Sequence, residues 1–352
     1  MESLDFSAGP NCFVGMNGMG KTNLLDAIYY CCMGKSHFGG QDRNVVRHEA
    51  DFFRLEAHFF KKEKKEKIVA KVIPGKQKII ERNTVPYQRL AEHVGGFPVV
   101  IIEPGDTALA LEGSGERRRF ADNTLSQLDS HYLLQLIAYH KVLKQRNASL
   151  KQFSADGRFD ASLIAAFANQ LIEPAGIIHK KRIEFVEKLH PVFNDYYQII
   201  SGQAEAVDCR YESKLTGRDF SKLLQEASEK DRLLQRTTVG IHKDDLIFSL
   251  NGFPLKRFAS QGQLKSYVLA LKLAQYELLK KEKEVLPILL LDDIFDKLDT
   301  SRVEHLIGLL FEKDFGQIFI TDTHQSRVEE IVENFGSSYK IFKIERGKVI
   351  EN

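Results

Sequence analysis

Apolar and polar residues alternate in three stretches of the first third of the chain. Residues 52–60, 67–73 and 77–82 follow this two-residue period, which is typical of half-buried strands. The short apolar run 98–102 predicts a further strand, buried on both faces. The lysine- and glutamate-rich run 61–67 lies between two predicted strands, so we expect a solvated hairpin turn there.

From residue 115 to residue 196 the pattern changes to a helical period with few turn signals. Two apolar stripes at helical spacing predict two long helices, and their residues are Leu133, Leu136, Ile137 and Leu143, then Ile178, Phe185, Val186 and Leu189. Pro174 is expected to kink or break the second helix, and the polar segment 154–160 joins the two. We interpret the stretch as a helical lobe or arm, with stripes that pack helix against helix.

The last part of the chain returns to an α/β pattern. Residues 288–291 and 317–321 are apolar runs of the kind found in parallel sheets, and residues 303–311 between them have helical spacing. Together they predict a βαβ unit. Residues 340–344 and 348–350 predict a terminal hairpin.

The composition is that of a soluble globular protein and limits the possible partners. The chain has 352 residues, of which 43% are hydrophobic and 28% charged, and its formal net charge is +2. A nucleic-acid surface would therefore have to be local. No apolar run approaches the length of a membrane span, and residues 1–5 show no signal-peptide pattern. The four cysteines show no metal-ligand spacing, so we expect a reducing cytoplasm.

Residues 15–22, Gly-Met-Asn-Gly-Met-Gly-Lys-Thr, match the phosphate-binding loop pattern G-x-x-x-x-G-K-[ST]. A predicted strand, 12–14, precedes the loop, and a predicted helix, 23–30, follows it and directs its positive end at the anion. Lys21 can reach the β- and γ-phosphates, and Thr22 can bind Mg²⁺. The alternative is a plain glycine-rich turn. We expect ATP to be bound by Gly15, Asn17, Gly18, Gly20, Lys21, Thr22 and Asn23.

A second element is needed to hold Mg²⁺ and orient water, and Leu289-Leu290-Leu291-Asp292-Asp293 has the required pattern. Its apolar strand ends in two acids at the sheet edge where α/β folds bind ligands. Asp292 would hold the metal through water, and Asp293 would act as base or orient the attacking water. The alternative is that both acids cap the next helix. We therefore predict Lys21, Asp292 and Asp293 as catalytic residues and Thr22 and Asp292 as the metal site.

Residues 258–266 open a predicted helix with Ser260 as its N-cap. This layout resembles the signature segment of ABC-type ATPases. The resemblance implies that Ser260, Gly262 and Gln263 contact the γ-phosphate held by a second subunit. Residues 295–299 resemble the D-loop of the same ATPases, and His324 lies where their switch histidine is found, which would make it catalytic. The alternative for His324 is a helix cap formed by residues 322–325.

Taken together, these segments resemble the RecF family of bacterial recombinational-repair proteins, which are ABC-type, SMC-like P-loop ATPases. The resemblance covers nearly the whole chain, and its further segments are 117–122, 139–147, 240–246, 260–263 and 291–299. It implies an α/β ATPase head with a mixed sheet and a mostly helical second lobe. We expect residues 1–112 and 237–352 to form the head and residues 113–236 the helical lobe.

The resemblance also implies a function in DNA repair, DNA replication and the SOS response. Members bind DNA at gaps and single-strand–duplex junctions, form an ATP-dependent homodimer, and help RecO and RecR to load RecA. Their ATPase is slow and needs ATP and Mg²⁺. Two alternatives stay open: a cohesin-like SMC-type clamp, which would call for a longer coiled coil, and a P-loop phosphotransferase, which would not need residues 260–263.

The chain departs from the family pattern at two places. The family has an opening strand before its P-loop strand, and because the loop here begins at Gly15 we expect that strand to be missing. Residues 240–245 read Gly-Ile-His-Lys-Asp-Asp where the family usually has Gly-Pro-His-Arg-Asp-Asp. Lys243 keeps the charge of the arginine but loses its planar fork.

Basic residues in the predicted helical lobe are candidates for contacts with DNA phosphates. The alternative for each is a solvated helix face with ion pairs inside the chain. The candidates are Arg117, Arg118, Arg119, Lys141, Lys144, Arg146, Lys151 and residues 179–182.

Overall fold

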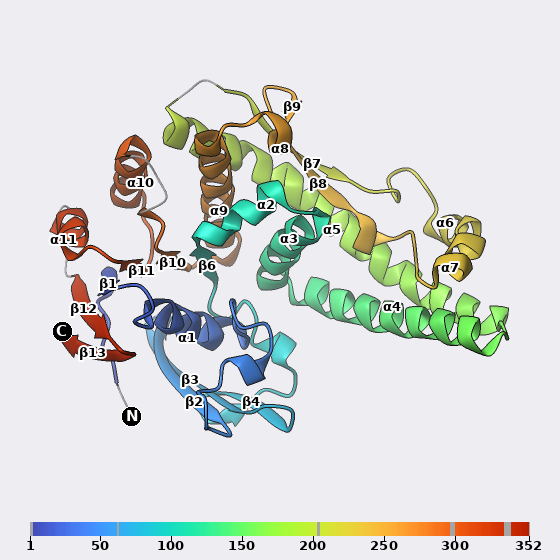
Figure 1. The fold of residues 1–352 in the computed structure, drawn as a ribbon, viewed down its shortest axis with the longest axis horizontal. Helices are drawn as coiled ribbons and strands as arrows, with labels where there is room; N and C mark the ends of the chain where they lie inside the picture. Colours follow the sequence, from blue (N-terminus) through green and yellow to red (C-terminus); the bar gives the residue numbers. More distant parts are fainter. Residues whose placement is uncertain (1–2, 62, 203–204, 296–299, 334–338, 352) are drawn as a thin grey trace. The chain divides into compact units, whose positions relative to one another are not determined.

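The computed structural model describes residues 3–61, 63–202, 205–295, 300–333 and 339–351. The chain divides into two compact units (Figure 1). Unit 1 consists of residues 1–107, 195–203 and 260–352, and unit 2 consists of residues 108–194 and 204–259.

Unit 1 is built on a six-stranded sheet in the order β13-β12-β1-β11-β10-β6. Strands β12, β1, β11, β10 and β6 are parallel, and only β13 is antiparallel to its neighbour among the described residues. The sheet is therefore mixed, as predicted. Its strands are β1 (Pro10–Val14), β6 (Val99–Ile102), β10 (Ile288–Asp292), β11 (Ile318–Asp322), β12 (Lys340–Glu345) and β13 (Lys348–Glu351).

A second, antiparallel sheet in unit 1 has the order β2-β3-β4-β5. Its strands are β2 (Phe53–Lys61), β3 (Lys64–Ile73), β4 (Gln77–Arg82) and β5 (Val85–Pro86). The predicted hairpin 61–67 is present, but its turn is shorter than predicted. Lys64 to Lys67 belong to β3 because their backbone pairs with β2; Lys64 and Lys65 are exposed, whereas Glu66 is buried and pairs with Arg82.

Helix α1 (Lys21–Met33) packs against both sheets of unit 1. The shared core contains Phe13 of the large sheet, Tyr29 of the helix and Ile68 of the small sheet, all buried. The remaining helices of unit 1 are α9 (Gln261–Lys283), α10 (Thr300–Glu312) and α11 (Gln325–Glu333), with the 3-10 turns η1 (Asp42–Asn44), η2 (Leu90–Glu92) and η3 (Pro104–Thr107). The predicted βαβ unit is confirmed by β10, α10 and β11, since β10 and β11 are parallel neighbours.

Unit 2 is mostly helical. Its elements are α2 (Ala108–Leu111), α3 (Ser114–Leu128), α4 (Ser130–Asp156), α5 (Ala161–Ser201), β7 (Val207–Glu212), α6 (Phe220–Glu226), α7 (Ser228–Leu234), η4 (Ile241–Lys243), β8 (Asp245–Leu250), β9 (Phe253–Pro254) and α8 (Leu255–Phe258). The last turn of α5 belongs to unit 1. Pro174 was expected to kink or break the helix; the break is wrong, because α5 continues through both Pro174 and Pro191, and the kink stays a prediction.

Helix α5 is also long and apolar enough, by length and composition alone, to cross a membrane. The sequence pattern predicted no such segment. Further along the same helix, Arg182 is buried and forms ion pairs with Asp122 and Asp244, so this part of α5 is an internal element of unit 2.

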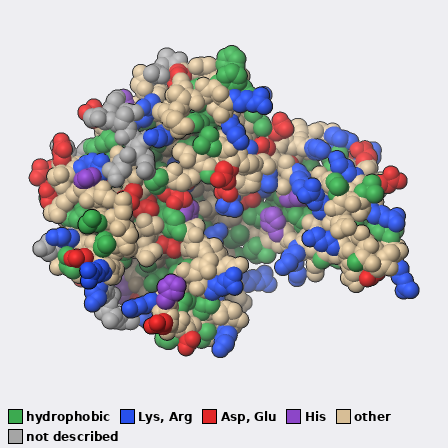
Figure 2. All heavy atoms as spheres, viewed as in Figure 1, with side chains coloured by type: hydrophobic (Ala, Val, Ile, Leu, Met, Phe, Trp, Pro, Cys, Tyr) green, Lys and Arg blue, Asp and Glu red, His purple; other side chains and the backbone are tan. Residues whose placement is uncertain are grey.

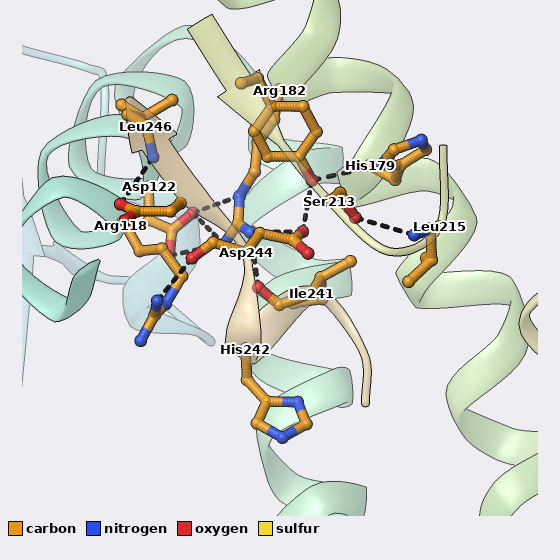
Figure 3. A network of polar contacts seen from close by, with 12 residues as sticks. Arg118, Asp122, His179, Arg182, Ser213, Leu215, Ile241, His242, Asp244 and Leu246 are labelled. Atoms are coloured by element: carbon orange, nitrogen blue, oxygen red, sulfur yellow. Dashed lines mark hydrogen bonds and ion pairs between the residues drawn. The ribbon is translucent and has the colours of Figure 1, made fainter. Parts of the chain in front are cut away.

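Buried arginine–carboxylate pairs hold the elements of unit 2 together. The guanidinium of Arg182 on α5 donates to Asp122 on α3, to Asp244 and to the backbone oxygen of Ile241 (Figure 3). The hydroxyl of Tyr211 on β7 donates to the same Asp244. These contacts satisfy charges that would be costly to bury alone.

A second buried pair joins α4 to α7. Arg146 Nη1 lies 2.7 Å from Asp231 Oδ2, and their side chains are 1% and 0% exposed. The other oxygen of Asp231 accepts hydrogen bonds from Thr238, and Arg146 also donates to Thr237. The pair therefore fixes the segment that leads to η4.

Replacing Arg146 with alanine should destabilise the protein strongly, because Asp231 would remain buried without its partner. We expect the free energy of unfolding to fall by about 3–5 kcal/mol, measured by urea denaturation followed by circular dichroism. Arg119→Ala is the matched control, since Arg119 is 73% exposed and pairs with Glu116 on the surface; its loss should be below about 1 kcal/mol. Equal losses in the two variants would contradict the structural role of the buried pair.

Candidate functional site

The predicted phosphate-binding loop connects β1 to α1, as the sequence pattern requires. Gly15 lies so close to β12 that an added Cβ would come within 2.4 Å of the Ile344 oxygen. Gly20 has φ 100°, in the region that glycine favours, and precedes the first residue of α1. Among the described residues no side chain caps α1 at Gly20, so its first N–H groups are left for a ligand. A phosphate group fits this end of the helix.

Lys21 lies at the base of the loop and is buried. Its Nζ donates to the backbone oxygen of Gly15 at 2.8 Å and lies 3.9 Å from Asp293 Oδ1. Asn17 and Gly18 are exposed at the outer part of the loop, and Asn23 is exposed in the first turn of α1. The loop therefore combines a buried cation, the ammonium group of Lys21, with exposed polar groups at Asn17, Gly18 and Asn23.

The two halves of the predicted metal site meet in the structure. Thr22 Oγ1 donates to the carboxylate of Asp292, at 3.1 Å from Oδ1 and 3.0 Å from Oδ2. Hydroxyl and carboxylate oxygens are ligands that Mg²⁺ accepts, so Thr22 could bind this ion directly and Asp292 could hold it through water. Burial raises the pKa of Asp292, while hydrogen bonds from Thr321 and Thr22 oppose the shift. An Mg²⁺ ion bound there would favour the charged carboxylate further.

Thr321 is a member of the site that the sequence analysis did not identify. Its hydroxyl, fully buried on β11, donates to Asp292 Oδ1 at 2.7 Å and accepts from the backbone N–H of Asp293 at 2.9 Å. Asp293 has φ 44°, in the left-handed region that non-glycine residues seldom adopt, although aspartate does so more often than most, and the Thr321 hydroxyl helps to hold it. The signal that could have identified Thr321 is its place at the carboxyl end of a parallel strand, next to β10.

Glu103 is a second residue near the site that the sequence analysis did not identify, and like Thr321 it lies at the carboxyl end of a strand next to β10. It follows the end of β6, the other neighbour of β10, and it contributes to raising the pKa of Asp292. Its carboxylate lies 3.0 Å from His37 Nε2. Acids from two adjacent strands therefore meet at one sheet edge.

The predicted signature segment begins α9, and Ser260 is its N-cap as expected. Ser260 and Gln263 form a reciprocal capping box, with the Ser260 hydroxyl accepting from Gln263 N–H at 3.2 Å. Arg302 of α10 lies against the same turn: its Nε donates to Ser266, and an added Cβ on Gly262 would come within 2.8 Å of its Nη2. These contacts position Ser260, Gly262 and Gln263 beside α10.

The structure shows a capping contact at His324. Its backbone N–H donates to Asp322 Oδ1 at 2.7 Å, and Asp322 also pairs with Arg327 of α11. The side chain of His324 is exposed, and its role as a switch residue stays a prediction. Residues 296–299 of the predicted D-loop lie outside the described part of the chain.

Comparisons with known proteins identify the family of the chain. The family model "RecF/RecN/SMC N terminal domain" matches residues 1–349. The DNA replication and repair protein RecF of Flavobacterium johnsoniae is 48% identical over 340 residues, which are 97% of this chain and 95% of that protein. The chain belongs to the RecF family.

Further relatives support the RecF fold. The RecF of Parabacteroides distasonis is 45% identical over 98% of this chain and 93% of that protein. A solved structure of the recombination mediator protein RecF with ATP in the RecFOR pathway has a TM-score of 0.87 and 29% identity, and covers 98% of this chain and 92% of that one. A Smc head domain from Pyrococcus furiosus shares the fold, with a TM-score of 0.53 and 17% identity; the match covers 98% of this chain and 90% of that one.

The structure sorts the basic residues that were candidates for DNA contacts. Arg117 forms two hydrogen bonds with Asp245, Arg146 and Arg182 are buried in ion pairs, and Lys181 lies 2.9 Å from Asp129. For these residues the alternative of ion pairs inside the chain holds. In Figure 2, lysine and arginine side chains gather over the part of unit 2 that contains α4, α6 and α7. Lys141, Lys144 and Lys151 of α4 are exposed.

Replacing Thr321 with valine should impair ATP turnover while leaving the fold intact, since valine has nearly the same shape. The Asp293 N–H would lose its acceptor and Asp292 one of its donors, at a cost of about 1–3 kcal/mol. We expect kcat for ATP hydrolysis to fall about tenfold to a hundredfold, measured with Mg²⁺ in excess. Thr321→Ser keeps the hydroxyl and should retain most activity; native turnover in Thr321→Val would contradict the positioning role.

Proposed function

We propose that this RecF-family chain is an ATP-dependent DNA-binding protein of recombinational repair and replication-fork maintenance. The observation that carries the proposal is the hydrogen bond between Thr22 and Asp292, 270 residues apart in the chain. It joins a phosphate-binding loop to an acid-ended strand, which is the arrangement that Mg²⁺-ATP chemistry needs. The RecF names of the relatives and the ATP form of the similar structure support the same function.

Each residue of the site has a role in this proposal. The α1 N-terminus and Lys21 bind and neutralise the phosphates, and Thr22 and Asp292 hold Mg²⁺, which supplies charge neutralisation at the transferred group. Asp293 lies within 3.9 Å of Lys21 and orients the attacking water. Thr321 fixes Asp292 and Asp293 relative to each other. Hydrolysis is slow and serves as a switch.

The proposed switch is a homodimer with ATP between the subunits. Gly262 lies against Arg302 of its own subunit, and Ser260 and Gln263 hold each other in the capping box; in the dimer the three residues contact the γ-phosphate bound by the other subunit. His324 approaches the same phosphate as a switch residue. ATP binding would close the dimer and hydrolysis would open it.

The proposed place of action is the cytoplasm, at gaps and junctions between single-stranded and duplex DNA. There the dimer would promote RecA loading together with RecO and RecR. The support is the family membership and the RecFOR context named for the similar structures. Unit 2 would contribute basic contacts to the DNA backbone.

A clamp of the SMC type is the second candidate, because the Smc head domain shares the fold. Such a clamp needs a long coiled coil. The two longest described helices, α4 and α5, have 27 and 41 residues, or about 40 and 60 Å at 1.5 Å per residue. The described helices therefore favour the RecF-like function.

DNA binding tests the proposal directly. We expect gapped duplex to bind more tightly than plain duplex when ATP is present, and the preference to disappear without ATP. Lys21→Met is the control, because removal of the phosphate-binding cation should abolish the effect of ATP. Fluorescence anisotropy with labelled DNA measures both affinities. Identical binding with and without ATP, or no preference for the gap, would contradict the proposed function.

A further inference from the structure

Three cations of unit 2 lie around the short turn η4. Arg118 comes from α3, Arg236 from the segment after α7, and Lys243 from the end of η4. Arg118 Nη1 donates to the backbone oxygen of Asp244 at 2.6 Å. Because Asp244 directly follows Lys243 in the chain, this bond places the guanidinium next to the backbone of Lys243. Arg236 and Lys243 are exposed, and Arg118 is half-buried.

His242 fixes the two loops that carry Arg236 and Lys243. Its Nε2 lies 3.1 Å from the backbone oxygen of Thr237, which directly follows Arg236, and its Nδ1 lies 2.7 Å from the hydroxyl of Tyr139. A carbonyl can only accept, so Nε2 carries the proton and Nδ1 accepts from tyrosine. Burial, opposed by the bond to Thr237, lowers the pKa of His242 to about 4. The ring is therefore neutral at pH 7 and acts as a rigid link.

The nearby carboxylates are already used by other residues. Asp244 and Asp122 pair with Arg182 (Figure 3), and Asp231 pairs with Arg146. Within the described ranges neither Arg236 nor Lys243 forms an ion pair. Burial and then the charges of Arg236 and Arg118 lower the pKa of Lys243, against the opposing charge of Asp231. Like charges are thus held close together at the surface, and the acids near them, Asp122, Asp231, Asp244 and Asp245, are paired with other residues.

We propose that Arg118, Arg236 and Lys243 bind a phosphodiester group of the DNA backbone. This inference rests on the proposed function and gives it a location in unit 2. An anion would relieve the repulsion among the three cations, and phosphate oxygens are the usual partners of arginine and lysine in DNA complexes. The contact reads no base, so it should be independent of sequence.

The test compares two double variants that remove the same charge from unit 2. Arg236→Ala with Lys243→Ala removes two of the three proposed cations, while Arg210→Ala with Arg218→Ala removes two exposed arginines of unit 2 that pair with Asp208 and Glu226. Arg118 is left unchanged because it also supports the backbone at Asp244. Binding of labelled gapped duplex is measured with ATP across a salt series, alongside ATP turnover and thermal unfolding.

The site variant should bind DNA about tenfold more weakly at low salt, and the slope of log K against log salt should flatten by about 1–2. Its ATP turnover without DNA and its unfolding temperature should match the native protein. Lys243→Arg should bind as well as the native protein. The control pair should retain native affinity and slope.

Two results would overturn the inference. One is native binding by the site variant, and the other is an equal loss in both double variants, which would show a diffuse charge effect. A native protein that does not bind gapped DNA at all would instead contradict the proposed function, so the two failures are distinguishable.

Discussion

The predicted ATP site depends on one contact, the hydrogen bond from Thr22 to Asp292. It forms because β1 and β10 both pair in parallel with β11, which brings the ends of three apolar strands to one edge of the sheet. Thr321 lies opposite Asp292 in this register and bonds to both acids. Because these strands are buried on both faces, their register is fixed, and with it the positions of the polar residues at their ends. A shift of the register by one residue would separate Thr321 from Asp292.

Unit 2 uses its charges in a different way. Buried carboxylates there are matched by arginines, so that Asp122, Asp231 and Asp244 hold helices and loops together. The consequence is that the acids near the exposed cations Arg236 and Lys243 of the η4 region are paired with other residues. These acids of unit 2 are thus used in buried ion pairs, and the two cations lie at its surface. That arrangement explains how a chain with a net charge of only +2 could still present a local site for phosphates.

The sequence was sufficient for the elements whose periodicity is strong and for the motifs beside them. The strand before Gly15, the strand ending at Asp292 and the N-cap at Ser260 all follow from local patterns. Thr321 and Glu103 were missed because their roles come from strand order, which no local pattern specifies. Likewise, Arg146 resembled a DNA contact because partners distant in the chain cannot be read from charge alone. Pro174 was tolerated in α5 against its local preference.

The most direct test of the account is the mass of the Asp293→Asn variant in solution. Multi-angle light scattering with and without Mg²⁺-ATP is the measurement, and the substitution slows hydrolysis so that the bound state persists. Lys21→Met combined with Asp293→Asn is the control that should not respond to ATP. We expect the mass of a monomer without ATP and of a dimer with ATP. A monomer under both conditions, at an ATP concentration that saturates the binding site, would contradict an ATP site completed by a second subunit.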